Sequence, residues 1–289
     1  MPERDGYIPG VPCWADTSQP DPDAAVAFYT RLFGWEFADV MAPGSEGKYL
    51  IARIRGGDVA AVGSLPEGAP PRAMWNTYVW VESADETALK VRDESGTVVM
   101  EPFDVMDAGR MAVFADPEGA AFCVWQAKQH KGARVVNENG SVNFNGLNTM
   151  DVDAAKAFYG SVFGWETLTL PSGDELWTLP GYGDHLERDN PGLRKMIAEV
   201  GGPAGFEDVV AALKPIDSGR ADMPARWDVT FAVDSAETVA RKATELGAKV
   251  LAGPFDAPWA RTTVIEDPQG ATFIANEFVP DNKDVATRA

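Results

Sequence analysis

The chain alternates between segments with the apolar period of a helix and segments with the period of a strand. Residues 21–34 begin with Asp-Pro-Asp, which favours a helix start, because an Asp N-cap accepts backbone N–H groups and Pro fits the first turn. Four apolar residues then share one helix face: Phe28, Tyr29, Leu32 and Phe33. Gly34 suits the left-handed position that ends a helix. Over Trp75–Val81 the period is two, which predicts a strand with alternate side chains on opposite faces.

This pattern occurs twice. AAVAFYTRLFGWEF at 24–37 matches AAKAFYGSVFGWET at 154–167 in nine of fourteen positions, at an offset of 130. Pro-Phe-Asp at 102–104 returns at 254–256, at an offset of 152, and DPEGAAF at 116–122 returns as DPQGATF at 267–273. Such self-similarity indicates two copies of one unit, the second with 22 additional residues.

Each copy contains two βαβββ modules in this interpretation. In the first copy, extended runs follow the first helix, a second helix covers about 83–94, and three further strands complete the unit. The sequence thus predicts an α+β protein with four modules: a first domain at 1–131, a linker at 132–140, a second domain at 141–281 and a tail at 282–289. The insertion near 183–215 is expected to form one helix after Asn190 and another over Phe206–Leu213. A lid over one cleft, a packing element and an oligomer contact are all open roles for this insertion.

Composition narrows the function. The 44 acidic and 25 basic residues give a net charge of −19 with no basic cluster, which argues against nucleic acid as a partner. No apolar stretch approaches the roughly 20 residues of a membrane span, and the first residues are no signal peptide. Two cysteines, Cys13 and Cys123, fit a reducing cytoplasm. Two histidines, His130 and His185, exclude a histidine-rich metal site.

The motifs together resemble the vicinal oxygen chelate superfamily, which contains glyoxalase I, bleomycin-resistance proteins, fosfomycin-resistance enzymes and extradiol dioxygenases. The resemblance rests on FYxxxFGW after a capped helix start, on DPxG before a last strand, and on βαβββ modules in series. It is nearest to a two-domain branch of antibiotic-producing bacteria that is labelled "hydroxylase". It implies two glyoxalase-like domains with cup-shaped mixed sheets, in which opposing strands hold a divalent metal.

The positions that the resemblance assigns to metal ligands carry few donors. They hold Trp14, Asn76 and Cys123 in the first copy and Phe144, Asp228 and Ile274 in the second. Catalytic metal sites need about three ligands of the His, Cys, Asp or Glu type. We therefore expect no metal and no other cofactor.

Strand alternation turns these side chains, together with others on the same strand faces, toward the two clefts. Aromatic rings bury large areas and stack on planar molecules, so this lining predicts a planar, hydrophobic small-molecule ligand. The predicted ligand-binding residues are Trp14, Asn76, Tyr78, Trp80, Cys123, Trp125, Phe144, Asp228, Thr230 and Asn276. In the context that the resemblance implies, the ligand is an aromatic natural product or antibiotic intermediate, sequestered for resistance or presented to a tailoring enzyme.

Other interpretations stay open. Trp14, Trp80, Trp125 and Phe144 could fill the cups as core, leaving a protein that acts through partner contacts. The alternative function is a metal-dependent lyase, isomerase or dioxygenase, and Asp228 and His185 are weak candidates for a general base. Whether the chain is an enzyme, and whether it is a monomer or a homodimer, is left open.

Overall fold

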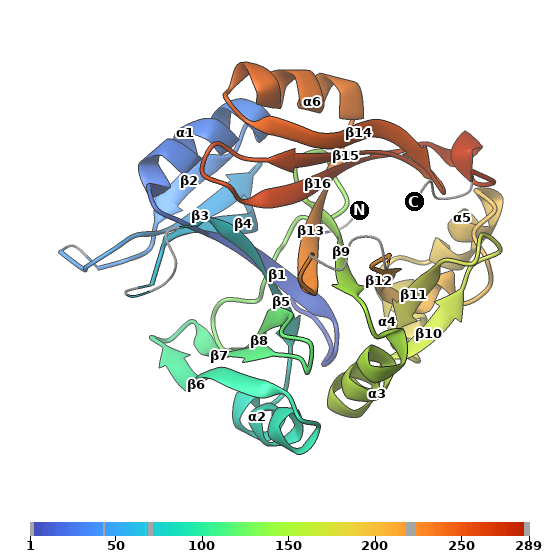
Figure 1. The fold of residues 1–289 in the computed structure, drawn as a ribbon, viewed down its shortest axis with the longest axis horizontal. Coiled ribbons are helices and arrows are strands. Elements are labelled where there is room, and N and C mark those ends of the chain that lie inside the picture. Colours follow the sequence, from blue (N-terminus) through green and yellow to red (C-terminus); the bar gives the residue numbers. More distant parts are fainter. Residues whose placement is uncertain (1–2, 43, 67, 69–71, 218–222, 286–289) are drawn as a thin grey trace.

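The computed structural model describes residues 3–285 except 43, 67, 69–71 and 218–222, and it contains two eight-stranded mixed sheets (Figure 1). The first sheet has the order β2-β3-β4-β1-β5-β8-β7-β6 and the second the order β10-β11-β12-β9-β13-β16-β15-β14. The first consists of β1 (Pro12–Gln19), β2 (Glu36–Asp39), β3 (Tyr49–Ile54), β4 (Gly57–Ser64), β5 (Met74–Trp80), β6 (Thr97–Val105), β7 (Gly109–Ala115) and β8 (Ala121–Ala127). The second consists of β9 (Val142–Thr149), β10 (Glu166–Thr169), β11 (Glu175–Thr178), β12 (Val209–Pro215), β13 (Arg226–Val233), β14 (Lys249–Ala257), β15 (Ala260–Glu266) and β16 (Thr272–Phe278).

One helix follows the first strand of each module: α1 (Pro22–Phe33), α2 (Ala84–Asp93), α3 (Val152–Phe163) and α6 (Ala236–Glu245). The predicted α+β class with tandem βαβββ modules is confirmed. The repeated helix starts act as predicted, since Asp21 and Asp151 each accept a backbone N–H at 3.0 Å. Gly34 and Gly164 end the two helices with φ of 78° and 73°, a conformation that favours glycine. None of the described helices has the length and apolarity that crossing a bilayer requires.

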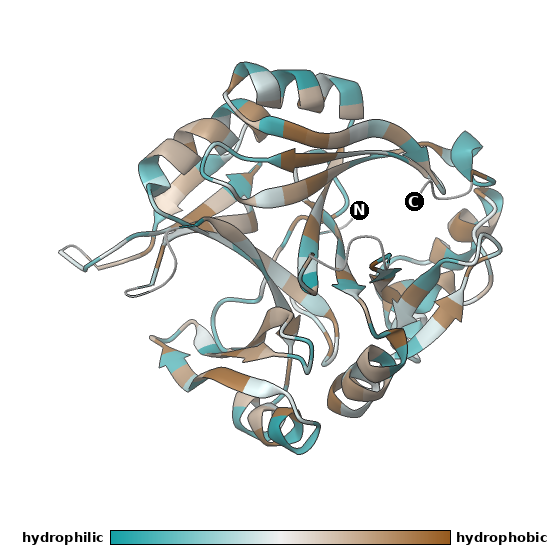
Figure 2. Ribbon diagram, viewed as in Figure 1, coloured by the Kyte–Doolittle hydropathy of each residue, from teal (hydrophilic) through white to brown (hydrophobic). Residues whose placement is uncertain are grey.

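Each sheet has a convex face, which we define as the face that packs against helices, and a concave face opposite to it. Hydrophobic and hydrophilic residues alternate along the strands (Figure 2). In the first sheet, Val79 and Phe122 belong to a convex-face core, whereas Tyr78 and Cys123 lie on the concave face. The two central strands of each sheet are antiparallel, with Asp16 opposite Asn76 in the first and Gly146 opposite Asp228 in the second.

The two convex-face cores are each shared by both copies of the repeat. One combines α2 and strands β5, β7 and β8 with α3 and strands of the second copy, including β9, β11 and β12. The other combines α1 and the strands β1, β3 and β4 with α6, β13, β15 and β16. The repeated tryptophans are divided between the two cores, with Trp35 and Trp75 in one and Trp165 and Trp227 in the other. The copies therefore interlock through their convex faces.

Residues of the repeated motifs bind the opposite copy. The hydroxyl of Tyr29 donates to Asp267 Oδ2 at 2.9 Å, and the hydroxyl of Tyr159 donates to Asp116 Oδ2 at 3.0 Å. The FGW indoles form a corresponding pair of bonds, from Trp35 to the Gly140 carbonyl at the end of the linker and from Trp165 to the Gly10 carbonyl of the first copy, both at 2.7 Å. The FY, FGW and DPxG motifs thus form a reciprocal junction between the copies.

The insertion differs in part from the prediction. The helix expected after Asn190 is present as α5 (Leu193–Glu199), and α4 (Tyr182–Asp189) precedes it. The helix predicted over Phe206–Leu213 is wrong: Phe206–Asp208 forms a short 3-10 helix, η1, and the residues after it form β12. Their apolar run pairs in parallel with β9, with Ala212 opposite Gly146, and backbone pairing decides between helix and strand for such runs.

The insertion also connects the two ends of the second sheet. The indole of Trp259, in the turn between β14 and β15, donates to the carbonyl of Val200 just after α5 at 2.9 Å. Figure 1 shows α5 beside that end of β14 and β15, with η3 (Pro280–Asn282) nearby. The second sheet is thus curved enough for the segment after α5 to contact the turn between β14 and β15.

Candidate functional site

The first concave face brings together six residues that the sequence predicts for ligand binding: Trp14, Asn76, Tyr78, Trp80, Cys123 and Trp125. The four at its centre are closely packed, and Trp14, Tyr78, Cys123 and Trp125 are only 5, 6, 4 and 6% exposed. They form an apolar cluster of their own, with Trp80 packed at its edge. Their packing matches the filled-cup interpretation, and their role in binding stays a prediction.

A buried carboxylate at the floor of this face was not predicted. Asp16 accepts hydrogen bonds from the hydroxyls of Tyr49 and Tyr78 at 2.9 and 2.7 Å and from Asn76 Nδ2 at 2.8 Å. Trp14 Nε1 in turn donates to the Tyr49 hydroxyl at 3.0 Å. Burial raises the pKa of Asp16, and the three donors oppose that effect. Asp16 lies two residues after Trp14, so strand alternation would have placed it on this face.

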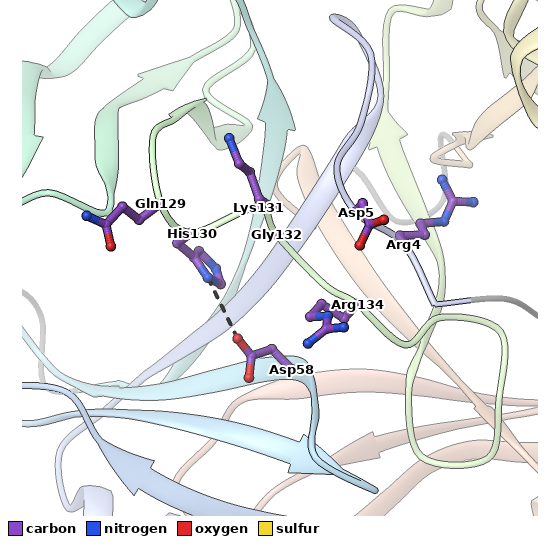
Figure 3. A pocket seen from close by; sticks show the side chains of 8 residues that line it. All are labelled: Arg4, Asp5, Asp58, Gln129, His130, Lys131, Gly132 and Arg134. Carbon is purple, nitrogen blue, oxygen red and sulfur yellow. Dashed lines mark ion pairs between the residues drawn. The ribbon is translucent and has the colours of Figure 1, made fainter. Parts of the chain in front are cut away.

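The segment after β8 covers the first concave face. The ring of His130 stands edge-on against Trp14 with centroids 4.5 Å apart, and Trp125 Nε1 donates to the His130 carbonyl at 2.9 Å. Burial lowers the pKa of His130, and its Nδ1 lies 3.9 Å from Asp58 Oδ2. This pair lines a polar pocket of about 250 Å³. Figure 3 shows Arg134 beside Asp58 at this pocket. Burial also raises the pKa of the Cys123 thiol, which disfavours the reactive thiolate form.

The second concave face is more open. Its predicted residues Phe144, Asp228, Thr230 and Asn276 lie on adjacent strands, with Thr230 opposite Phe144. Phe144 and Asn276 are partly exposed, and Phe278, farther along β16, is 61% exposed. Within the described ranges, no buried apolar cluster forms on this face. A cavity of about 350 Å³ lies at its end, lined by residues that include Asn143, Ala232, Asn276 and Phe278.

A polar group occupies the other end of this face. Asp228 accepts hydrogen bonds from Asn148 Nδ2 at 2.7 Å and from Arg226 Nε at 3.2 Å. Lys214 extends from β12 across Gly146, where an added Cβ would lie 3.0 Å from its Cε and 3.1 Å from its Nζ. Burial lowers the pKa of Lys214, and the charge of Asp228 opposes that effect. Sequence reasoning missed Lys214 because its strand was assigned partly to a helix.

The other weak base candidate, His185, lies elsewhere. It is in α4, where its Nε2 is 3.5 Å from Asp189 and its ring is stacked near Tyr182. Tyr182 belongs to a convex-face core, and its hydroxyl accepts from Arg4 at 2.8 Å. The structure therefore does not bring His185 and Asp228 together on one face.

The residues at the six positions that the resemblance assigns to metal ligands do not fit a catalytic metal. Trp14, Phe144 and Ile274 offer no atom that coordinates a metal, and Asn76 is hydrogen-bonded to Asp16. In the part of the chain that the structure describes, no three His, Cys, Asp or Glu side chains lie close enough to hold an ion. Catalytic sites for zinc or iron need about three such ligands. The donor atoms on the two concave faces thus differ from those that the resemblance implies.

Comparison with curated proteins gives relatives that match over most of both chains. The chain is 40% identical to "Putative glyoxylase CFP32" of Mycobacterium tuberculosis over 94% of its own length and 97% of that protein. It is 34% identical to "Anthracycline biosynthesis protein DnrV" of Streptomyces peucetius and to "Anthracycline biosynthesis protein DauV" of Streptomyces sp. strain C5, over 94% of both chains in each case.

Solved structures share the fold at low sequence identity. The Mn(II)-bound glyoxalase from Novosphingobium aromaticivorans superposes with a TM-score of 0.59 at 16% identity, covering 93% of this chain and 82% of that one. The 2,3-dioxygenase LapB from Pseudomonas sp. KL28 gives 0.58 at 11% identity, covering 94% and 93%. A family model described as "Glyoxalase/Bleomycin resistance protein/Dioxygenase superfamily" matches residues 17–124, and one described as "Glyoxalase-like domain" matches 144–275. The chain belongs to the glyoxalase/bleomycin resistance protein/dioxygenase superfamily.

Proposed function

We propose that this protein binds a planar, largely hydrophobic small molecule without a metal, and holds it for sequestration or for a tailoring step. The observation that carries the proposal is the second concave face, where aromatic side chains remain partly exposed instead of packing into a core. Phe144 and Phe278 provide ring surfaces there, and exposed aromatic groups in a concave site favour flat apolar ligands.

The dimensions of the second concave face suit such a ligand. Asp228, Thr230 and Ala232 are alternate residues of β13 and share its concave side. At about 3.3 Å per residue, the distance from Asp228 to Ala232 is about 13 Å. The cavity of about 350 Å³ beside Ala232 extends the face at one end. The first concave face offers less room, because its central side chains are buried against one another.

The relatives support the chemical class. Two of them are named as anthracycline biosynthesis proteins, and anthracyclines carry a planar fused-ring system. An aromatic polyketide or a precursor of one is therefore the ligand class that we assign to this chain.

Calorimetric titration tests the proposal. The probe is the methyl ester of anthraquinone-2-carboxylic acid, which is flat and uncharged, added to protein that has been treated with EDTA. We expect saturable binding that Phe144→Ala weakens, while Phe103→Ala, a change at an exposed phenylalanine of the first sheet, leaves it unchanged. Trp80→Ala tests the first face in the same way. Absence of binding, or binding that requires added Fe, Ni, Zn or Mn, would contradict the proposal and favour the metal-dependent alternative.

A further inference from the structure

The amine of Lys214 lies on the second concave face and has no acceptor among the residues that the structure describes. Its ammonium forms no hydrogen bond or ion pair with the described residues, although it extends over Gly146 next to Asp228. A partly buried ammonium without an acceptor is unfavourable, because it has lost part of its hydration and gained no partner. An acceptor that arrives with a ligand would supply the missing partner.

We propose that Lys214 recognises an acidic oxygen of the ligand, a carboxylate or an ionised phenol, on the second concave face. This inference rests on the proposed function and narrows its ligand class to planar aromatic acids. The ring system contacts Phe144, and the acidic group points toward Lys214.

The charges around Lys214 favour an anion. Arg226 and Lys214 bring two positive charges to this end of the face, and Asp228 brings one negative charge. Asp228 is already bound by Asn148 and Arg226, and no described residue accepts a hydrogen bond from Lys214. This local excess of one positive charge occurs in a chain with a net charge of −19.

The first copy has the opposite arrangement. Gly146 corresponds to Asp16 at the repeat offset of 130, and Asp16 is buried beneath three donors of its own chain. In the second copy, the residue at this position has no side chain, and a lysine from the neighbouring strand occupies the space. The carboxyl group of the first face thus has hydrogen-bond donors from its own chain, whereas the ammonium of the second face has no acceptor among the described residues.

The experiment compares anthraquinone-2-carboxylate with its methyl ester by calorimetry. The two probes share one ring system and differ in charge. We expect the wild-type protein to bind the acid about tenfold more tightly than the ester, as one charge-assisted hydrogen bond provides. Lys214→Met should abolish that preference, so that the acid and the ester bind with similar affinity, and Lys214→Arg should retain most of it.

Lys249→Met is the matched control, because Lys249 is an exposed lysine of the same sheet whose partner is Glu266. It should change neither affinity. Thermal unfolding of each variant establishes that it is folded. Equal affinity for acid and ester in the wild-type protein, or an acid preference that survives in Lys214→Met, would overturn the assignment of Lys214 and leave the proposed function standing. A wild-type protein that binds neither probe would contradict both.

Discussion

Replacing Tyr159 by Phe removes a hydroxyl from the junction between the copies. Tyr159 is fully buried, and its hydroxyl donates to Asp116 Oδ2 and accepts from Trp227 Nε1 at 2.9 Å. Phe fills the same space, so the change deletes these two hydrogen bonds with little loss of packing. No other described group donates to that oxygen of Asp116, and the Trp227 N–H loses its acceptor.

The expected loss follows from these two bonds. A hydrogen bond to a carboxylate contributes about 1.5–3 kcal/mol, and a buried donor without a partner costs about 1–3 kcal/mol. The free energy of unfolding should therefore fall by roughly 3–5 kcal/mol in Tyr159→Phe. Tyr29→Phe is the matched comparison. Asp267 Oδ2 there keeps a second donor, Gln19 Nε2 at 2.8 Å, and the loss should be smaller by about 1–2 kcal/mol.

Urea unfolding, followed by tryptophan fluorescence and by circular dichroism, measures both variants. Because each convex-face core contains both copies, the two signals should change together in one transition. The reasoning is refuted if Tyr159→Phe costs less than about 1 kcal/mol, or if Tyr29→Phe costs as much as Tyr159→Phe.

Three further predictions concern the concave faces. Burial raises the pKa of Asp16, so the contribution of this group to stability is greatest below the unfolded pKa of about 3.9 and is lost as the pH rises through the folded pKa. Relative to Asp16→Asn, the wild-type protein should therefore lose stability from about pH 4 upward. A difference in urea unfolding that does not depend on pH would contradict this. Burial lowers the pKa of Lys214, so binding of anthraquinone-2-carboxylate should weaken as the pH rises, beginning below the ordinary lysine value of about 10.4, while calorimetry on Lys214→Met should show no such decline. Gly146→Ala places a methyl group 3.0 Å from Lys214 Cε and should displace that side chain. The affinity for the acid should fall while the affinity for the ester does not, and the free energy of unfolding should change by less than about 1 kcal/mol. Unchanged selectivity would show that Lys214 does not need the space over Gly146.

The modules were predictable because their signals are local. Capped helix starts, alternating strands and the repeated FGW and DPxG motifs lie within short stretches, and the alternation also predicted which side of β5 and β8 faces the helices. The partner of each motif was not predictable in this way. Trp35 and Tyr29 bond to residues more than 100 and more than 200 positions away, and no period along the chain encodes such a distance.

The polar residues of the two faces were missed for different reasons. Asp16 follows from the same alternation that selected Trp14, so its signal was present in the sequence. The position of Lys214 on the concave face can be predicted only if Val209–Pro215 is recognised as a strand. A short apolar run of this kind is compatible with a helix and with a strand until its neighbour in the sheet is known. His130 lies in a segment without periodicity, and only the fold places it against Trp14.

Joining both copies in one polypeptide has a consequence for how the two cups can evolve. In a symmetric pair of identical subunits, every mutation is present in both cups, so a residue that suits one must be tolerated by the other. Here Asp16 and Gly146 occupy corresponding places and are encoded separately. One cup could therefore become a closely packed support whose carboxyl group is hydrogen-bonded within the chain, while the other was free to acquire new recognition chemistry.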